Sequence, residues 1–464
     1  MCATKKGEMK MNQNQGIYDA RQLGRGKMFI LGVQHMFAMF GATVLVPALT
    51  GLSVSATLLF AGLGTLLFHL ITKRMVPAFL GSSFAFIGGY TAIAPMLEDG
   101  TPNTEMLPYA CFGVALAGLM YAILSALFKI FGTKKVMRYF PPIVTGPMII
   151  CIGLTLSSGA ITNCRENWAI ALIAVAIVVG CNIWGKGMVK IIPILLGVVG
   201  SYLVAVICQL TGMNTMDPAK LQALSDAAWI GLPFRFEDTL FGLFSRPNLD
   251  TGMLLTAAVT IMPLSLATMV EHIGDICAIS STCERNYLQN PGFHRTLLGD
   301  GLATTLASIF GAPANTTYGE NTGVLALSKV YDPKVIRIAA GLAILFSFSP
   351  KFAALVSAMP TATMGGVSMV LYGMISAVGV RNVVENQVDF TNSRNVIIAA
   401  VIMVLAIGIN YSGAVTFQVG EATISLSGLA VAAIVGIALN AILPGKDYEF
   451  GTDEKGDTAV NFKV

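Results

Sequence analysis

Charged side chains are scarce in this chain. Asp, Glu, Lys and Arg make up only 12% of its 464 residues, whereas 55% are hydrophobic and the mean hydropathy is +0.71. Soluble domains carry roughly 25% charged residues. So small a supply of charge cannot cover a water-facing surface of this size, which predicts that much of the surface faces lipid. The net charge of +4 is scattered, without the basic stripe that nucleic acid requires, so nucleic-acid binding is excluded.

Motifs for metal binding and covalent catalysis are also missing from the sequence. The eight cysteines form no CxxC motif and the four histidines show no metal-ligand spacing, so we predict no metal and no cofactor. We find no phosphate-binding loop, no nucleophile–base pair and no soluble domain that would drive a nucleotide-powered pump. These absences argue against an enzyme. The polar, basic residues 1–27 are too long for a cleaved signal peptide and predict a cytoplasmic tail.

Long apolar runs divide the chain into candidate membrane helices of about 20 residues, the length that crosses the hydrocarbon core. We predict fourteen spans, near residues 28–49, 52–71, 77–92, 107–130, 138–160, 167–184, 190–211, 251–282, 294–310, 312–328, 335–350, 352–378, 395–412 and 422–443. The third and tenth are short and rich in Gly, Pro, Ser and Thr. With both termini inside, Lys and Arg concentrate in the cytoplasmic loops, whereas a count of thirteen would invert half of these loops.

An internal repeat relates the two halves of the chain. The string VQHMFAM at 33–39 resembles VEHIGDI at 270–276, and each precedes a broken segment that contains a hydroxyl residue followed by an aromatic one. These pairs are Ser83-Phe84 and Thr317-Tyr318. Because seven is odd, a seven-helix unit repeated twice must be inverted across the membrane. Transporters of this construction bind substrate at the midplane, where broken helices meet, so we predict a site there.

Four acidic residues lie within the predicted spans: Glu271, Asp275, Asp300 and Glu320. A charge at the middle of a bilayer costs roughly 3 kcal/mol, so such residues predict a functional site. Glu271 and Asp275 share one helix face, where a low dielectric disfavours ionisation of both, as a proton carrier needs. Glu320 follows the break of the tenth span and should face the gap between repeats. The alternative is that the acids pair with buried Arg or Lys, but the neighbouring apolar spans contain no base. Asp300 either joins the group or ties helices together.

Polar and aromatic residues near the broken segments are further candidates. His35 either hydrogen-bonds within the site or makes an ordinary interhelical contact. His272 lies about 100° around the helix from Glu271, so the two side chains cannot both centre on one ligand. Three aromatic residues either stack on a planar ring or simply pack in the interior. They are Phe84, Tyr318 and Tyr372.

Four sequence strings together resemble one transporter family. QHMFAMFGATVLVP, PAFLGSSFAFI, EHIGD and APANTTYGENTGVLA are similar to those of the nucleobase–ascorbate transporter family, in its bacterial uracil-permease type. The resemblance covers residues 25–445 and implies an all-α polytopic membrane protein with 14 transmembrane segments as 7+7 inverted repeats. The short third and tenth segments would contain extended strands. The implied domains are a cytoplasmic tail 1–27, core 28–130, gate 138–211, outer loop 212–250, core 251–350, gate 352–443 and a cytoplasmic tail 444–464.

The resemblance also implies roles for individual residues. Glu271 and Glu320 would hydrogen-bond a nucleobase, the backbone N–H groups of Phe84 and Gly319 would reach it, and Tyr372 would line the site. Supporting positions would be His35, Ser83, Asn321 and Tyr318. One departure concerns Asp275, because uracil permeases of this type can carry His there and purine-transporting relatives carry Asp.

Proton-coupled uptake of uracil by alternating access is the function that the resemblance implies, in the bacterial inner membrane with both termini cytoplasmic. Uracil offers two N–H donors and two carbonyl acceptors, and acids that share a proton can both accept and donate. We expect the coupled proton on Glu271, Asp275 and Glu320, with Asp300 in the same network. A xanthine or other purine permease is the nearest alternative. An anion transporter of the same fold is remote, since paired acids disfavour anions; a homodimer is compatible with the family.

Overall fold

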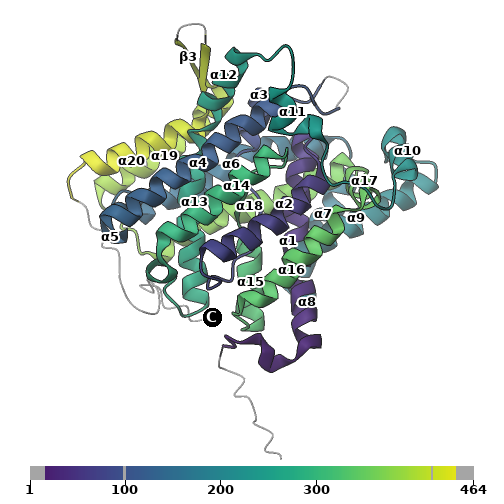
Figure 1. The fold of residues 1–464 in the computed structure, drawn as a ribbon, viewed down its shortest axis with the longest axis horizontal. Coiled ribbons are helices and arrows are strands. Elements are labelled where there is room, and N and C mark those ends of the chain that lie inside the picture. Colours follow the sequence, from purple (N-terminus) through teal and green to yellow (C-terminus); the bar gives the residue numbers. More distant parts are fainter. Residues whose placement is uncertain (1–15, 98–100, 420–421, 446–464) are drawn as a thin grey trace, which may run out of the picture.

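Helices make up most of the computed structural model, which describes residues 16–97, 101–419 and 422–445 (Figure 1). The first half contains η1 (Ala20–Leu23), α1 (Arg25–Thr50), α2 (Val54–Ile71), β1 (Leu80–Ser82), α3 (Ile87–Ile93), α4 (Leu107–Phe131), α5 (Thr133–Met137), α6 (Pro142–Arg165), α7 (Trp168–Trp184), α8 (Met188–Ile191) and α9 (Pro193–Leu210). The second half contains α10 (Pro218–Asp226), η2 (Phe236–Asp238), α11 (Leu240–Phe244), α12 (Thr251–Ile261), α13 (Leu264–Thr282), η3 (Leu288–Gly292), α14 (Phe293–Ile309), β2 (Asn315–Thr317), α15 (Gly319–Ser328), α16 (Pro333–Ser347), α17 (Pro350–Ser357), α18 (Thr361–Glu385), α19 (Ser393–Ser412), β3 (Val415–Val419), β4 (Ala422–Leu426) and α20 (Gly428–Ile442).

Many of these helices are able to cross a bilayer. Eight helices of the described chain are long and apolar enough to do so, with α12 and α13 together forming the span Thr251–Thr282. A ninth is reached if α16 and α17, which are bent by 89°, count as one span, and α7 and α20 are shorter apolar helices. The chain is therefore a multi-pass membrane protein. The predicted tails lie outside the described residues over 1–15 and 446–464.

One predicted span begins in the wrong place. The run 352–378 was expected to form a single helix, but α17 ends at Ser357 and α18 begins only at Thr361. Pro360 immediately precedes α18 and has no backbone N–H, so it starts a new helix rather than continuing the old one. The apolar composition of the run conceals this break, because hydropathy does not register a change in chain direction.

Two three-residue strands interrupt the third and tenth predicted segments. β1 and β2 pair antiparallel, with Gly81 opposite Thr316, and each strand is followed by a short helix, α3 or α15. The strands expected from the resemblance are confirmed. Their pairing satisfies backbone groups that hydrocarbon would leave without partners. Side chains add to this, since Leu80 N–H donates to Thr65 Oγ1 over 2.9 Å and the Asn315 amide donates to Phe60 O over 3.0 Å.

Glycine allows two helix pairs to pack closely. A Cβ at Gly301 of α14 would lie 2.6 Å from the carbonyl oxygen of Gly118 on α4, and a Cβ at Gly379 of α18 would lie 2.7 Å from that of Gly146 on α6. Only residues without a side chain permit backbones to approach so closely in a membrane bundle. α4 and α14 accordingly run side by side (Figure 1), as do α6 and α18.

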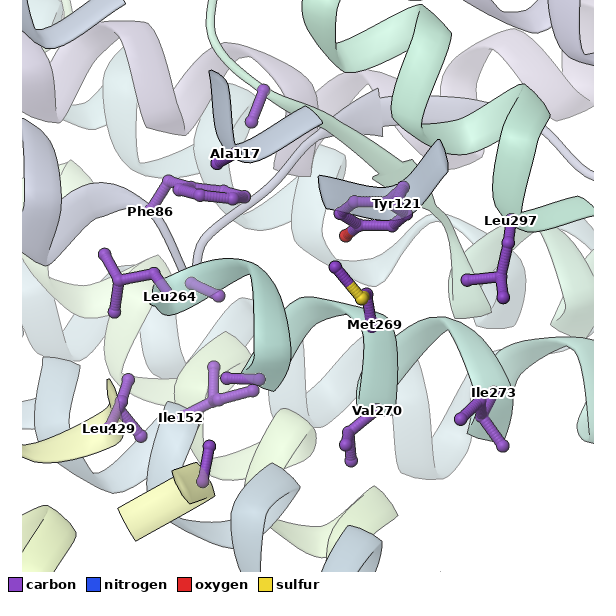
Figure 2. Packing of buried hydrophobic residues seen from close by; sticks show 14 of the residues in the cluster. Phe86, Ala117, Tyr121, Ile152, Leu264, Met269, Val270, Ile273, Leu297 and Leu429 are labelled. Carbon is purple, nitrogen blue, oxygen red and sulfur yellow. The ribbon is translucent and has the colours of Figure 1, made fainter. Parts of the chain in front are cut away.

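Helix α13 lies between these two pairs. Figure 2 shows Tyr121 of α4 and Leu297 of α14 on one side of α13, with Ile152 of α6 and Leu429 of α20 on the other. All four side chains are at least nine-tenths buried. Substitutions on α13 therefore act on both groups of helices at once.

The N-terminal strap, residues 16–24, lies against the loops at one end of the bundle. Ile17 N–H donates to Lys329 O over 2.7 Å, and the Tyr18 hydroxyl donates to Cys283 O over 2.8 Å. These two acceptors follow α15 and α13 respectively. The part of the expected N-terminal tail that the structure describes is thus packed against the protein.

Candidate functional site

Helix α13 carries the two carboxylates that the sequence places on one face. The Thr317 hydroxyl, at the end of β2, donates to Oδ2 of Asp275 over 2.7 Å. Oε2 of Glu271 is buried and has no hydrogen-bond partner in the described structure. An unpartnered carboxylate oxygen in such a place is costly, and a ligand with an N–H donor would satisfy it.

The N-terminus of α15 faces these acids. Gly319 and Glu320 are its first two residues, and Tyr318 at the cap position makes no side-chain capping bond. The N–H groups of a first helical turn have no carbonyl partner within the helix, and they carry the positive end of the helix dipole. Helix α13 packs against both α14 and α15, so the four predicted acids lie on three helices, of which α13 contacts the other two.

An aromatic pair packs in the same buried cluster as Tyr318, the residue that precedes α15. Phe84 lies between β1 and α3, Tyr372 lies on α18, and their ring centroids are 5.8 Å apart in an edge-to-face arrangement at 76°. Both side chains are buried. The pair joins the strand-containing segment to α18, and rings so placed offer both a face and an edge to a planar ligand.

Two supporting residues connect α1 to α15. The Asn321 amide donates to His35 O over 3.0 Å and lies 3.1 Å from His35 Nδ1. Nε2 of His35 is buried without a partner. Because Asn321 directly follows Glu320, this contact fixes the first turn of α15. His35 thus makes an interhelical contact and keeps one ring nitrogen available.

The hydroxyl of Tyr318 is held by β1 and α1. Its hydroxyl donates to Ser82 O over 2.9 Å and accepts from Thr43 Oγ1 over 3.3 Å. Its ring packs where a side chain at Gly81 would stand, so it braces β1 rather than offering a face to a ligand. Ser83 donates its N–H to Ala314 O over 2.8 Å, and its buried hydroxyl has no partner in the described structure.

Asp300 is paired on the other side of α13. Oδ2 of Asp300 lies 3.1 Å from Nδ1 of His272, and both side chains are completely buried. The rings of Phe68 and Phe293 lie next to His272, at centroid distances of 6.4 and 5.8 Å. The two atoms are within ion-pair distance but do not meet hydrogen-bond geometry in the described structure, so the contact places α14 against α13 without deciding between the two roles that the sequence leaves open for Asp300.

Thr317 and His272 were not identified as partners of the acids from sequence. Thr317 was noticed only as a repeat position, although a hydroxyl beside a broken segment is a natural donor to a carboxylate. His272 was set aside because it points away from Glu271, which is the reason it reaches Asp300. Among the described residues, no group of three His, Cys, Asp or Glu side chains is arranged to hold a metal ion.

The sequence itself is similar to a known family along most of its length. The profile of the xanthine and uracil permeases, described as "Permease family", matches residues 26–414. The chain belongs to this family. It is a transporter of the nucleobase–ascorbate transporter family and not an enzyme.

Relatives agree with this membership, and a solved transporter structure shares the fold. The uracil permease of Bacillus subtilis (strain 168) is 39% identical over 91% of this chain and 94% of its own length. The uracil permease of Bacillus caldolyticus is 40% identical over 91% and 93%. The transmembrane domain of the cyanobacterial bicarbonate transporter BicA superposes with a TM-score of 0.56 at 16% identity, covering 92% of this chain and 100% of that one. That likeness shows a shared fold only.

Proposed function

We propose that this permease takes up uracil together with protons across the bacterial cytoplasmic membrane. The observation that carries the proposal is that α13, which contains Glu271, packs against α15, which begins with Gly319 and Glu320. The Phe84–Tyr372 ring pair would lie beside these acids. The relatives named above are uracil permeases, which supports uracil as the substrate.

The chemistry of uracil matches this arrangement. Glu271 would accept a ring N–H through its unpartnered Oε2. The carboxyl group of Glu320 would hydrogen-bond to the neighbouring edge of the uracil ring. The backbone N–H groups of Gly319 and of Phe84, for which the described residues offer no acceptor, would donate to a ring carbonyl. Tyr372 would close one face of the ring.

Protons would enter with the substrate. The charges of Asp275, Glu320 and Asp300 all act on Glu271, and those of Glu320 and Asp300 also act on Asp275. Several negative charges in a low dielectric disfavour full ionisation. A proton shared within this group would remove that repulsion and supply a donor for a uracil carbonyl. The empty, fully ionised site would be unfavourable, so proton and uracil would bind together.

Alternating access would follow from a division into core and gate. Fourteen segments as two inverted repeats of seven are supported by the antiparallel pairing of β1 with β2, each of which leads into a short helix. The close pairs α4–α14 and α6–α18 would belong to core and gate respectively. Movement of the core against the gate, with α13 at their boundary, would expose the site to each side in turn. Both termini would be cytoplasmic, as the distribution of Lys and Arg requires.

Uptake in liposomes tests the proposal directly. Labelled uracil should accumulate under an inward proton gradient and leak back when a protonophore collapses it. Glu271→Gln should abolish uracil binding, while Glu105→Gln at an exposed outer position should leave it unchanged. Near-normal binding by Glu271→Gln contradicts the assignment of this residue, and accumulation without a gradient contradicts proton coupling.

Asp275 allows the coupling role to be tested separately from binding. Asp275→Asn keeps the size of the side chain and a possible contact with Thr317, but it cannot ionise. Uptake by this variant should depend less on pH than uptake by the unmodified protein. An unchanged pH profile would show that the coupled proton resides on the other acids.

A purine substrate is the alternative that the sequence resemblance leaves open. The resemblance implies that purine-transporting relatives carry Asp at the position of Asp275. Competition decides the matter, because excess xanthine should leave uracil uptake intact if the site is built for pyrimidines. Strong inhibition by xanthine, together with transport of labelled xanthine, would identify xanthine rather than uracil as the substrate. The assignment of the acidic site would be unaffected.

A further inference from the structure

Basic side chains gather at one end of the bundle, away from the acidic site. Lys73 follows α2, Lys129 belongs to the last turn of α4, and Arg295 to the first turn of α14. The positive charges of all three act on the ring of His294. Three helix ends that are distant in the sequence therefore present their positive charge to one place.

Packing contacts hold this cluster together. The Arg295 guanidinium donates to Ile71 O over 3.1 Å, which attaches α14 to the end of α2. The Ser125 hydroxyl donates to His294 O over 2.6 Å, which attaches α4 to the same turn of α14. The cluster is thus a fixed arrangement of three helix ends and not a chance meeting of mobile side chains.

No acid neutralises the cluster in the described part of the chain. The ion pairs recorded there involve neither Lys73, Lys129 nor Arg295. Asp332, whose charge acts on the nearby Arg337, forms an ion pair with Lys334 over 3.3 Å. Like charges kept together without a counter-charge repel one another, and an anion would relieve that repulsion.

The helix dipole of α14 adds to the positive potential. Its N-terminus has no side-chain cap and no acid in its first turn, so the positive end of the dipole also favours an anion.

The cluster borders a surface that lipid chains would cover. Leu70 at the end of α2 is 64% exposed, and Ile130 and Phe131 at the end of α4 are 72% and 54% exposed. Large apolar side chains so exposed in a membrane protein contact lipid hydrocarbon. A molecule with acyl chains and a phosphate would satisfy the apolar surface and the adjacent charges together, whereas free phosphate would use only the charges.

We propose that Lys73, Lys129 and Arg295 form a binding site for the phosphate of an anionic phospholipid headgroup. The lipid lies with its acyl chains along the exposed ends of α2 and α4, and its phosphate faces the N-terminus of α14. Such a lipid bridges three helices of the group that includes α14, the helix that carries Asp300. Basic pockets between membrane helices bind anionic headgroups by the same electrostatics.

Native mass spectrometry of the purified full chain tests the site, with phosphatidylglycerol and phosphatidylcholine as probes. Lys73→Gln/Lys129→Gln removes two exposed charges and leaves Arg295 in its contact with Ile71. Each Lys near an anionic headgroup contributes about 1 kcal/mol, so the affinity of the tightest phosphatidylglycerol site should fall roughly thirtyfold. Lys186→Gln/Lys190→Gln, which removes two exposed charges elsewhere, should leave it unchanged.

Several outcomes would overturn the proposal. Equal phosphatidylglycerol affinity in the double variant and the unmodified protein would show that the cluster holds no lipid. Equal binding of phosphatidylcholine would show that charge plays no part. Thermal stabilisation by glycerol 1-phosphate as large as that by phosphatidylglycerol would identify a soluble phosphate site instead. Lys129→Gln alone, expected to lower the affinity roughly fivefold, provides the same comparison if the double variant proves unstable without lipid.

Discussion

The hydroxyl of Thr317 donates to Oδ2 of Asp275 over 2.7 Å, and so joins the last residue of β2 to a carboxylate one turn along α13 from Glu271. Its neighbour Thr316 has a buried hydroxyl with no partner in the described structure. These two adjacent, buried threonines point to opposite faces of the strand, and only the hydroxyl of Thr317 has an acceptor in the described structure. The difference makes them a matched pair for mutation.

Thr317→Val should destabilise the protein, because Val keeps the shape of Thr but cannot donate to Asp275. Hydrogen bonds to charged groups contribute about 1.5–3 kcal/mol, and the carboxylate would be left with an unsatisfied oxygen. The melting temperature in detergent and the rate of uracil uptake should both decrease. Thr316→Val should be neutral or slightly stabilising, since it removes an unpartnered hydroxyl. Equal effects of the two substitutions would show that the bond to Asp275 has no energetic role.

Gly301→Ala should loosen the contact between α14 and α4. The added methyl group would overlap Cβ of Tyr121 and lie 2.6 Å from Gly118 O, so the two helices must separate. Overpacking of this kind costs about 1–3 kcal/mol. Gly341→Ala in the interior of α16, where nothing lies within 4 Å of the added methyl group, should stabilise instead, because Ala favours the helix. Thermal unfolding of both variants measures the contrast.

The acidic residues and the broken segments of the site were predictable from sequence because both violate a general rule. Glu271 and Glu320 are charges in apolar surroundings, and the third and tenth segments contain too much Gly, Pro, Ser and Thr for ordinary membrane helices. The inverted repeat, the domain boundaries and the ligand roles of these residues stay predictions. The structure adds that α13 and α15 bring the two glutamates to one place.

The pairing of side chains was not predictable, because the sequence does not determine the rotation of one element against another. Thr317 reaches Asp275 only through the register of β2 beside α13, and His272 meets Asp300 only because α14 lies on that side. The division between α17 and α18 was also missed, since its proline lies within an apolar run. These features depend on tertiary packing, about which hydropathy and charge patterns carry little information.

The N-terminal strap should detach when Tyr18 is truncated. Tyr18 donates to Cys283 O over 2.8 Å, and the Arg285 guanidinium lies 3.9 Å from the centre of its ring. Tyr18→Ala removes both contacts, so trypsin should cleave after the exposed Arg21 several times faster than in the unmodified protein. Tyr18→Phe keeps the ring and should accelerate cleavage much less. Identical cleavage rates in all three proteins would show that Tyr18 does not hold the strap.

Asp238→Asn should stabilise the protein more at neutral pH than at acid pH. Asp238 lies half-buried in η2, between α9 and α12, and burial raises the pKa of its carboxyl group above the ordinary value. A raised folded-state pKa means that the carboxyl group favours folding while it is protonated, and that this contribution is lost as the pH rises through the folded-state value. The amide cannot ionise and avoids the loss. The melting temperature of Asp238→Asn should therefore exceed that of the unmodified protein at pH 7 and approach it towards pH 3, whereas Glu237→Gln at the exposed neighbouring position should not show this trend. A difference in melting temperature that is constant with pH would assign the effect to packing or hydrogen bonding rather than to ionisation of Asp238.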